Sequence, residues 1–323
     1  MNAPVLHVAG LRRHFTQTKG FPNPVTVTVR AVDGVSFDVA VGEAFGLVGE
    51  SGCGKSTVAR AALRLIEPDE GTVRFRDTDV LAARGSGLKA LRRKMQIVFQ
   101  DPYSSLNPRR GIAATLTEPM AVHGILRGAA ARQRAQQLLE EVGLPPAALD
   151  RYPHEFSGGQ RQRLGIARAL SVEPELLVAD EPVSALDVSV QAQVLVLLRD
   201  LQQRRGLSFL FVSHDLAVVR WFCSRLAVMY LGRIVEQGPV ADVFREPLHP
   251  YTRVLRDASP SPDPSLRTKL PRIEGEIPSA ANPPPGCHFH ARCPHVMPVC
   301  REQYPALRDM GGGRQVACHL HGG

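Results

Sequence analysis

The nine residues GESGCGKST, at positions 49–57, decide the fold of this chain. They follow the apolar run AFGLV at 44–48 and open the segment KSTVARAALRLI at 55–66, which has the apolar spacing of a helix. The pattern G-x-x-x-x-G-K-S/T between a strand and a helix is typical of a loop that holds the phosphates of a nucleotide. We therefore expect a nucleotide-binding protein of the α/β class.

The residue types of this phosphate loop suit its chemistry. Glycines let backbone N–H groups turn inward around phosphate oxygens, and the N-terminus of the following helix adds partial positive charge. Lys55 is expected to reach the β- and γ-phosphates of ATP, and the Ser56 hydroxyl to bind Mg²⁺. The predicted nucleotide-binding residues of the loop are Gly49, Ser51, Gly52, Gly54, Lys55, Ser56 and Thr57.

A second stretch, ELLVADEP at 175–182, supplies the acidic groups that such a site needs. Its apolar residues predict a buried strand that ends at Asp180, where a carboxylate can hold the water shell of Mg²⁺. Glu181 follows directly and is placed to polarise a water molecule as a general base. Together with the phosphate loop, this pair predicts a P-loop NTPase, with the nucleotide still open.

The composition is that of an ordinary globular protein. The chain has 323 residues, of which 44% are hydrophobic and 22% charged, and this length suits one large domain or two smaller ones. The net charge is +8, but the arginines are scattered, and no basic tail with interleaved aromatics is present. We therefore interpret the charge as a solvated surface that can also lie near anionic lipid, and we expect no nucleic-acid partner.

The sequence contains no pattern that predicts a membrane span or a secretory signal. No apolar run reaches the roughly 18–20 residues that a membrane helix requires. The N-terminus, MNAPVLHVAGLRRHF, lacks a charged region followed by an apolar one. The expected compartment is the cytoplasm, where cysteines stay reduced.

Apolar and β-branched runs alternate with helical patterns along the chain, which predicts a mostly parallel sheet covered on both faces. The predicted strands lie at 25–29, 35–39, 44–49, 71–76, 95–100, 175–180 and 207–214, and the predicted helices at 55–66, 129–142, 157–170 and 190–204. Composition changes near residue 245. We therefore predict one domain at 1–245 and a C-terminal region at 246–323 that contains a proline-rich linker.

The stretch FSGGQRQR at 156–163 narrows the type of nucleotide enzyme. A serine and two glycines open a helix and make a second anion-binding N-terminus. The phosphate loop and this second helix N-terminus of one chain cannot both bind the same nucleotide. Two chains that face each other head to tail can use both sites, because each then closes on the ATP bound by the other. The stretch resembles the signature sequence of ATP-binding cassette (ABC) proteins, and this resemblance assigns Ser157, Gly158, Gly159 and Gln160 to the partner's nucleotide.

The resemblance to ABC proteins covers about residues 5–245 and implies a fold. That fold is a P-loop NTPase (RecA-like) core with an antiparallel β subdomain and a helical signature subdomain at about 101–170. A small, irregular, cysteine-rich C-terminal region follows it.

The same resemblance implies further site residues. Gln100 matches the glutamine that contacts Mg²⁺ and the attacking water, and His214 matches the switch histidine near the γ-phosphate. Asp187 in SALD belongs to the loop that communicates between subunits. Phe15 is the implied adenine-stacking aromatic, with Phe21 as its rival.

Three other stretches resemble the ATPase subunits of oligopeptide/dipeptide importers: QDPYSSLNPR at 100–109, PLHPYTRVL at 247–255 and the cysteine-rich tail. The first is nearer to the second of the two paired ATPase subunits. The resemblance implies a paired ABC ATPase subunit, two transmembrane permease subunits and an extracytoplasmic peptide-binding protein, with this chain at the cytoplasmic face of the membrane. A heterodimer is implied and a homodimer stays open. Importers of nickel, glutathione or other small solutes share these features.

Other functions fit the sequence less well. Cassette ATPases that act on nucleic acid usually have two cassettes or a long coiled-coil insertion, and this sequence has neither. The peptide-importer tail argues against an exporter, and the N-K-x-D motif of a GTPase is missing. We therefore expect ATP hydrolysis that drives import.

Four cysteines gather near the C-terminus, at Cys287, Cys293, Cys300 and Cys318. Structural zinc sites more often use two tight pairs, whereas wider spacings on proline-rich loops suit four thiolates around a 4Fe–4S cluster. The resemblance to peptide-importer ATPases points the same way. Zinc, and reduced thiols in a small packed core, stay open as alternatives. The histidines that could substitute as ligands are His288, His290, His295 and His319. In each case we expect stabilisation or regulation rather than catalysis.

Two cysteines lie outside this cluster. Cys53, inside the phosphate loop, is predicted to be a small filler with an accessible thiol and no catalytic role, although its alkylation should block nucleotide. Cys223 is predicted to be a buried packing residue.

Overall fold

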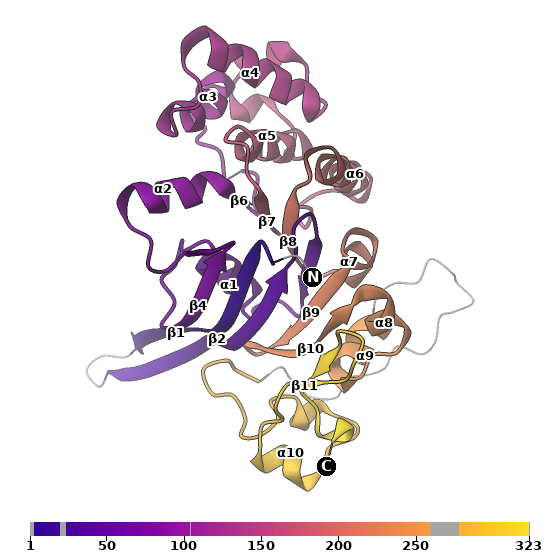
Figure 1. The fold of residues 1–323 in the computed structure, drawn as a ribbon. Coiled ribbons are helices and arrows are strands. Elements are labelled where there is room, and N and C mark those ends of the chain that lie inside the picture. The colour runs from indigo at the N-terminus through magenta and orange to yellow at the C-terminus, as the bar shows by residue number, and fades with distance from the viewer. Residues whose placement is uncertain (1–2, 20–23, 104, 259–277, 323) are drawn as a thin grey trace. The chain divides into compact units, whose positions relative to one another are not determined.

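The structure is a computed structural model, and it describes residues 3–19, 24–103, 105–258 and 278–322. The chain divides into two compact units, whose helices and strands are drawn in Figure 1. The first unit consists of Met1–Val5, Val39–Glu43 and Phe75–Val212, and the second of Leu6–Asp38, Ala44–Arg74 and Ser213–Gly323. Most of the predicted proline-rich linker, and Phe21, lie outside the described residues.

The first unit is built on three parallel strands, β6 (Met95–Val98), β7 (Leu176–Asp180) and β8 (Ser208–Ser213). Strand β7 lies between the other two and pairs with both. Every residue of β7 and β8 is buried, which explains their nearly continuous apolar sequences. The predicted strands at 95–100, 175–180 and 207–214 are thus confirmed, although β6 ends two residues before Gln100.

Helices make up most of the rest of the first unit. They are α2 (Gly85–Lys94), α3 (Ile112–Val122), α4 (Gly128–Glu141), α5 (Gly158–Leu170) and α6 (Val188–Arg205), with short 3₁₀ helices at Pro146–Asp150 and Pro153–Glu155 and a short strand β5 (Thr78–Asp79). Helices α4, α5 and α6 confirm the predictions within one or two residues at most ends. Helix α2 was not predicted, because Leu91 is its one buried side chain and it therefore shows no apolar stripe.

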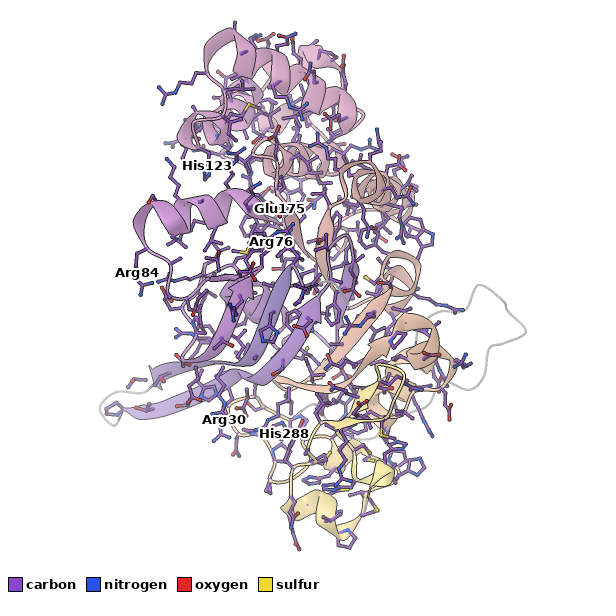
Figure 2. The ribbon with its side chains drawn as sticks, in the orientation of Figure 1. Arg30, Arg76, Arg84, His123, Glu175 and His288 are labelled. Atoms are coloured by element: carbon purple, nitrogen blue, oxygen red, sulfur yellow. The ribbon has the colours of Figure 1, made fainter. Side chains whose placement is uncertain are left out.

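An ion-pair cluster fixes the start of strand β7, as Figure 2 shows for Arg76 and Glu175. The Glu175 carboxylate pairs with Arg76 at 2.7 Å and with Lys94 at 3.0 Å. Burial alone would raise the pKa of Glu175, but the hydrogen bonds from Lys94 and Arg76 hold it below the usual value. The backbone N–H of Glu175 also donates to the Lys94 carbonyl, so the end of α2 and the start of β7 are held together.

The second unit contains a sheet in which β2 (Val25–Val39), β1 (Leu6–Lys19) and β4 (Glu70–Phe75) are neighbours. The prediction of two short strands at 25–29 and 35–39 was wrong, because one strand of 15 residues spans both. The intervening DG resembles a turn in the sequence, but Gly34, at φ +81°, lies inside the strand instead. Val32 and Val35, on either side of it, are fully buried.

A second set of strands in this unit joins its core to the C-terminal tail. Strand β3 (Ala44–Val48) runs parallel to β9 (Arg225–Tyr230), which is antiparallel to β10 (Arg233–Pro239). Strand β10 then pairs with β12 (Gln315–Val316), and β12 with β11 (Arg308–Asp309). The tail was expected to be irregular, yet it adds two short strands to the edge at β10.

The helices of the second unit are α1 (Lys55–Ala62), α7 (Leu216–Phe222), α8 (Val240–Arg245), α9 (Pro250–Ala258) and α10 (Pro298–Glu302), with 3₁₀ helices η4 (His290–Arg292) and η5 (His319–His321). Helix α1 ends four residues before the predicted end, because Arg64 turns out of it with φ +51°. Within the described parts of the chain, no helix is both long enough and apolar enough to cross a membrane.

Candidate nucleotide-binding site

The phosphate loop connects β3 to α1 in the second unit, as the sequence predicted. Gly54 has φ +107°, and a Cβ atom there would lie 1.9 Å from the carbonyl oxygen of Ala31. Gly49 has φ +154°, and its Cβ would lie 2.3 Å from the carbonyl oxygen of Met229. These two positions therefore require glycine, both for backbone conformation and for space.

Lys55 is the first residue of α1, and its side chain turns back into the loop. The side chain is 3% exposed. Its Nζ donates to the Gly49 carbonyl oxygen at 2.8 Å and to the Glu50 carbonyl oxygen at 2.9 Å. A buried ammonium held by two carbonyl groups places a fixed positive charge beside the start of a helix, an arrangement that attracts an anion.

The remaining predicted residues of the loop lie around this charge. Ser51 and Gly52 are exposed, and Ser56 and Thr57 are half-buried in the first turn of α1. The N-cap residue of α1 is Gly54, which has no side chain that could cap the helix, and the N-terminus of a helix attracts anions.

In the first unit, β6 and β7 bring Gln100 and Glu181 together. Nε2 of Gln100 donates to Oε2 of Glu181 at 3.1 Å. Glu181 has φ +48°, a strained conformation for a side chain of this size, and its N–H donates to the Val212 carbonyl oxygen at 3.0 Å. Asp180, the last residue of β7, is fully buried.

The donor types of these residues suit Mg²⁺. The Asp180 carboxylate, the Ser56 hydroxyl and the amide oxygen of Gln100 are hard oxygen ligands. Because the Gln100 amide nitrogen is engaged by Glu181, its oxygen is the atom left for a cation. Each of these oxygens is therefore of the type that binds Mg²⁺, the ion that accompanies ATP.

The signature stretch forms the N-terminus of α5 in the first unit. The Ser157 hydroxyl accepts the Gln160 N–H at 3.3 Å, and the Gln160 side chain accepts the Ser157 N–H at 3.0 Å, which completes a capping box. Gly159 is buried, and a Cβ there would lie 2.3 Å from Cγ1 of Val190 in α6. A Cβ at Gly158 would make only an ordinary contact with Leu186, at 3.5 Å. Gly159 is therefore the glycine that lets α5 begin close against α6.

Three other predicted site residues, His214, Asp187 and Phe15, are exposed or half-buried. His214 is exposed and directly follows β8. Asp187 is exposed at the N-cap position of α6 and makes no side-chain capping bond. Phe15, in β1, is half-buried, and the Arg13 guanidinium lies 4.8 Å from the centre of its ring.

The four C-terminal cysteines are free thiols in the second unit. The Cys287 N–H donates to the Cys300 carbonyl oxygen at 2.8 Å. Burial raises the pKa of the Cys287 thiol to about 12, and nearby Cys300, Cys318 and Cys293 add to the increase, which places the four thiols in one neighbourhood. Among the described residues, no group of three or more His, Cys, Asp or Glu side chains is arranged to hold a metal ion.

The histidines proposed as substitute ligands have other partners. His290 contacts the Cys287 carbonyl oxygen through Nδ1 at 2.9 Å, and His319 contacts the Gln303 carbonyl oxygen through Nε2 at 2.9 Å. His288 packs against the Tyr304 ring. His295 donates its backbone N–H to Sγ of Cys293 at 3.4 Å, a contact that would favour a thiolate.

Two residues that contact the phosphate loop were not predicted from the sequence. Tyr251 forms a hydrogen bond with the Glu50 backbone, and Arg292 forms an ion pair with the Glu50 carboxylate. Tyr251 lies in PLHPYTRVL, which served only as a family marker, and no local pattern singles out Arg292. The signal that could have found them is the acidic residue inside the loop, which needs a partner if it is to be buried.

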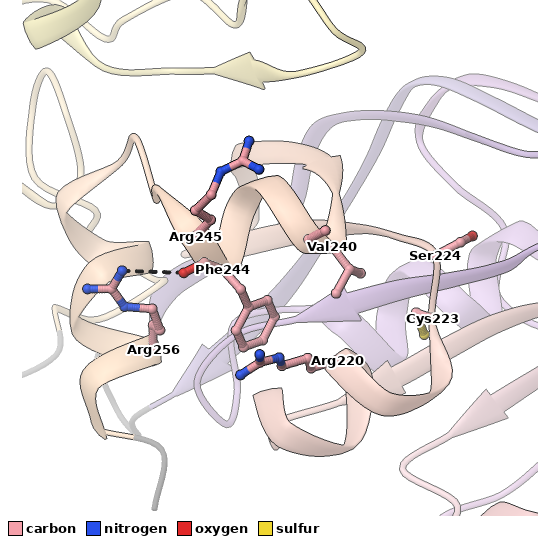
Figure 3. A pocket seen from close by; sticks show the side chains of 8 residues that line it. Arg220, Cys223, Ser224, Val240, Phe244, Arg245 and Arg256 are labelled. Atoms are coloured by element: carbon pink, nitrogen blue, oxygen red, sulfur yellow. Dashed lines mark hydrogen bonds between the residues drawn. The ribbon is translucent and has the colours of Figure 1, made fainter. Parts of the chain in front are cut away.

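A separate pocket of about 680 Å³ in the second unit has a basic rim (Figure 3). The Arg220 guanidinium lies 5.5 Å from the centre of the Phe244 ring, and Arg256 donates to the Phe244 carbonyl oxygen. None of the residues that line it belongs to the predicted nucleotide site.

Comparisons with known proteins show the family of this chain. The family described as ABC transporter matches residues 32–184, and the oligopeptide/dipeptide transporter C-terminal region matches residues 235–300. The chain is 52% identical, over 98% of its length and 96% of the relative's, to a Bacillus subtilis protein named as an oligopeptide transport ATP-binding protein. It is also 52% identical, over 98% of its length and 97% of the relative's, to a Brucella ovis protein named as a peptide import ATP-binding protein.

A solved structure shows the same architecture. It is a dimeric ATP-binding cassette in a post-hydrolysis state, bound to ADP and phosphate, and it is 28% identical to this chain. The match has a TM-score of 0.62 and covers 73% of this chain and 98% of the cassette. The P-loop NTPase fold predicted from the sequence is therefore confirmed, and the chain belongs to the ATP-hydrolysing subunits of ABC transporters, in the group that carries the oligopeptide/dipeptide transporter C-terminal region.

Proposed function

We propose that this chain binds and hydrolyses ATP to power the import of peptides through a membrane ABC transporter. The observation that carries the proposal is the combination of a complete phosphate loop with a C-terminal region of the oligopeptide/dipeptide type in one chain. The names of the relatives, oligopeptide transport and peptide import ATP-binding proteins, support peptides as the cargo. Nickel, glutathione or another small solute is the alternative cargo, and action on nucleic acid is a more distant one.

In this proposal the phosphate loop and Lys55 bind the phosphates of ATP. Ser56, Gln100 and Asp180 hold Mg²⁺, which neutralises phosphate charge when it is bound. Glu181 accepts a proton from the attacking water, and the hydrogen bond from Gln100 orients its carboxylate for that task. His214 contacts the γ-phosphate, and Phe15 stacks on adenine.

Two such chains would face each other head to tail. Ser157, Gly158, Gly159 and Gln160 then bind the ATP held by the partner's phosphate loop, because Ser157 and Gln160 are exposed and the N-terminus of a helix attracts anions. Asp187 lies in the loop that meets the partner. Closure of the pair moves two permease subunits, with the segment around 101–170 as their dock, and hydrolysis opens the pair again.

The other partners follow from this role. We propose a second ABC ATPase subunit, two transmembrane permeases and an extracytoplasmic peptide-binding protein. The chain itself would be peripheral, at the cytoplasmic face of the membrane. The division into a nucleotide-binding domain at 1–245 and a C-terminal region at 246–323 belongs to the same proposal.

For the C-terminal cysteines we propose a 4Fe–4S cluster, with zinc as the alternative. The mutual influence of the four thiols supports a shared group, and the N–H of His295 on Cys293 is of the kind that stabilises a metal-bound thiolate. Iron, sulfide and zinc assays on protein purified without oxygen test this. About four iron and four sulfide per chain would support the cluster, one zinc would support the alternative, and neither would leave packed thiols.

The replacement Glu181→Gln tests the hydrolytic role. We expect ATP binding to persist while turnover falls by about 100-fold or more, because the amide cannot accept a proton. The exposed Glu140→Gln in α4 is the matched control and should leave turnover unchanged. Near-normal turnover in the Glu181 variant would remove the general-base assignment.

The cargo is tested in the assembled transporter with its binding protein. Peptides should stimulate ATP hydrolysis in vesicles, whereas nickel ions and glutathione should not. Stimulation by nickel or glutathione alone would replace peptide as the cargo and leave the ATPase role intact.

A further inference from the structure

Glu50, the second residue of the phosphate loop, is held from two sides by the C-terminal region of the same unit. Its backbone N–H donates to the Tyr251 hydroxyl at 2.9 Å. Its carboxylate accepts two hydrogen bonds from the Arg292 guanidinium, at 3.1 and 3.2 Å, and the Arg292 side chain is only 6% exposed. A paired, two-pronged contact of this kind fixes both the charge and the orientation of the carboxylate.

The Tyr251 hydroxyl is aimed at the loop by a buried network. The Tyr251 N–H donates to Nδ1 of His249 at 3.0 Å, so the histidine ring caps the start of α9. Burial, with a small contribution from His321, lowers the pKa of His249 to about 3, so Nδ1 stays an acceptor at neutral pH. The backbone N–H of His249 in turn donates to the fully buried carboxylate of Glu236 at 2.9 Å.

Aromatic packing fixes the other parts of this arrangement. The rings of Tyr230 and Tyr251 have centroids 4.6 Å apart, and Phe289 lies 5.4 Å from each of them. Arg292 lies one turn after Phe289, and its guanidinium is 5.8 Å from the Phe289 ring. Both side chains that reach Glu50 are therefore held by one small aromatic core, which the C-terminal region forms with Tyr230 of β9.

Glu50 matters because its carbonyl oxygen is one of the two that hold Lys55. The Lys55 Nζ lies 2.9 Å from that oxygen, so a rotation of the Glu50 peptide would move the ammonium. A cavity of about 200 Å³ borders Glu50 and is also lined by Cys53, Tyr230 and Pro278, so packing does not enclose this part of the loop on all sides.

We propose that Tyr251 and Arg292 are positioning residues for ATP: they fix the Glu50 peptide and thereby the Lys55 ammonium. The C-terminal region, which the ABC transporter match at 32–184 does not include, is then part of the support of the nucleotide site. The inference rests on the proposed role of Lys55 as the phosphate ligand.

The test is equilibrium binding of a fluorescent ATP analogue, with Mg²⁺, to the purified full chain. Tyr251→Phe removes one hydroxyl from a packed ring and should weaken binding about fivefold, and Arg292→Gln should weaken it about tenfold, with melting temperatures close to that of the unmodified chain. Arg292→Lys should restore part of the loss, because it keeps the charge without the fork. Tyr304→Phe is the matched control, since Tyr304 contacts Arg233 and not the loop, and it should bind normally.

A double-mutant cycle makes the test specific. Glu50→Gln should weaken binding as Arg292→Gln does, and the double variant should be no weaker than either. If Arg292→Gln fails to fold, Arg292→Lys and Tyr251→Phe carry the test. Normal binding in Tyr251→Phe and Arg292→Lys, together with lost binding in Lys55→Ala, would overturn the inference. Normal binding in Lys55→Ala would instead overturn the proposed nucleotide site.

Discussion

The phosphate loop at 49–57 and the cysteine-rich segment at 287–318 lie in the same compact unit but are held in different ways. Nine successive residues set the loop, with three glycines at positive φ and a helix that follows at once. The segment depends on partners far away in sequence, such as the pairing of β12 with β10. The position of a side chain that the local backbone fixes can be predicted from a sequence motif. The positions of the four thiols depend on contacts between distant parts of the chain, so they can be recognised only in the whole structure.

The contacts of Glu50 join these two regions. Substitutions that displace the loop backbone should therefore abolish nucleotide binding. Substitutions in the C-terminal region should weaken nucleotide binding by a smaller factor.

Gly54→Ala should have the largest effect. The added Cβ would need φ +107° and would lie 1.9 Å from the Ala31 carbonyl oxygen, so the backbone must move. We expect ATP-analogue affinity to fall by about 100-fold or more, and the free energy of unfolding by about 2–3 kcal/mol. Titration of the analogue and chemical denaturation measure the two effects.

Gly87→Ala is the matched control for this prediction. Gly87 lies in α2, where a Cβ would meet nothing within 4 Å. Alanine there should leave nucleotide binding unchanged and stabilise the chain by about 0.5–1 kcal/mol. Equal effects of the two alanines would contradict a loop fixed by its backbone.

His249 provides a pH test in the C-terminal region. Its pKa in the folded chain is about 3, so between that value and the ordinary 6.5 only the unfolded chain takes up the proton. Stability should therefore fall as pH falls below 6.5, and His249 should account for about 2 kcal/mol at pH 5. His249→Asn keeps a capping side chain that does not titrate, so it should lose less stability between pH 7 and pH 5.

Denaturation curves of both proteins at the two pH values give the difference that belongs to His249. Asp33, Glu141 and Glu175, whose pKa values are lowered in the fold, also lose stabilisation in acid, but they do so in both proteins. Identical losses in the two proteins would show that His249 is not buried as a neutral ring.

The sequence predicted the elements that contiguous residues determine, but not those that depend on distant contacts. The strand ending at Asp180 and the helix beginning at Gly158 were predicted closely, because their signals are contiguous. The long strand β2 was missed, because Asp33 and Gly34 inside it have the local composition of a turn. The partners of Glu50 were missed, because Tyr251 and Arg292 lie about 200 and 240 residues further along the chain and only tertiary packing brings them there.

Replacing the four cysteines by serine tests whether the cysteine-rich segment supports the loop. Cys293 directly follows Arg292, and Cys287 shortly precedes it, so a loosened segment should release the guanidinium from Glu50. We expect ATP-analogue affinity to fall about tenfold, as in Arg292→Gln, and the combination of both changes to be no worse. Cys223→Ala, outside the segment, is the control. Unchanged affinity for the ATP analogue in the serine variant would show that the four thiols do not support the phosphate loop.

The smallest effect is expected for Cys53→Ala. The prediction that the Cys53 thiol is accessible was wrong, because the residue is only 5% exposed. Burial raises the pKa of this thiol, so it is protonated and reacts slowly at neutral pH. Its sulfur lies 3.8 Å from the Lys55 Nζ, a weak contact compared with the two carbonyl bonds. We therefore expect affinity to change by less than about twofold. Prolonged maleimide treatment should block nucleotide binding in the unmodified chain and spare the alanine variant. A loss as large as that of Gly54→Ala would mean that a side chain, rather than the backbone, shapes the loop.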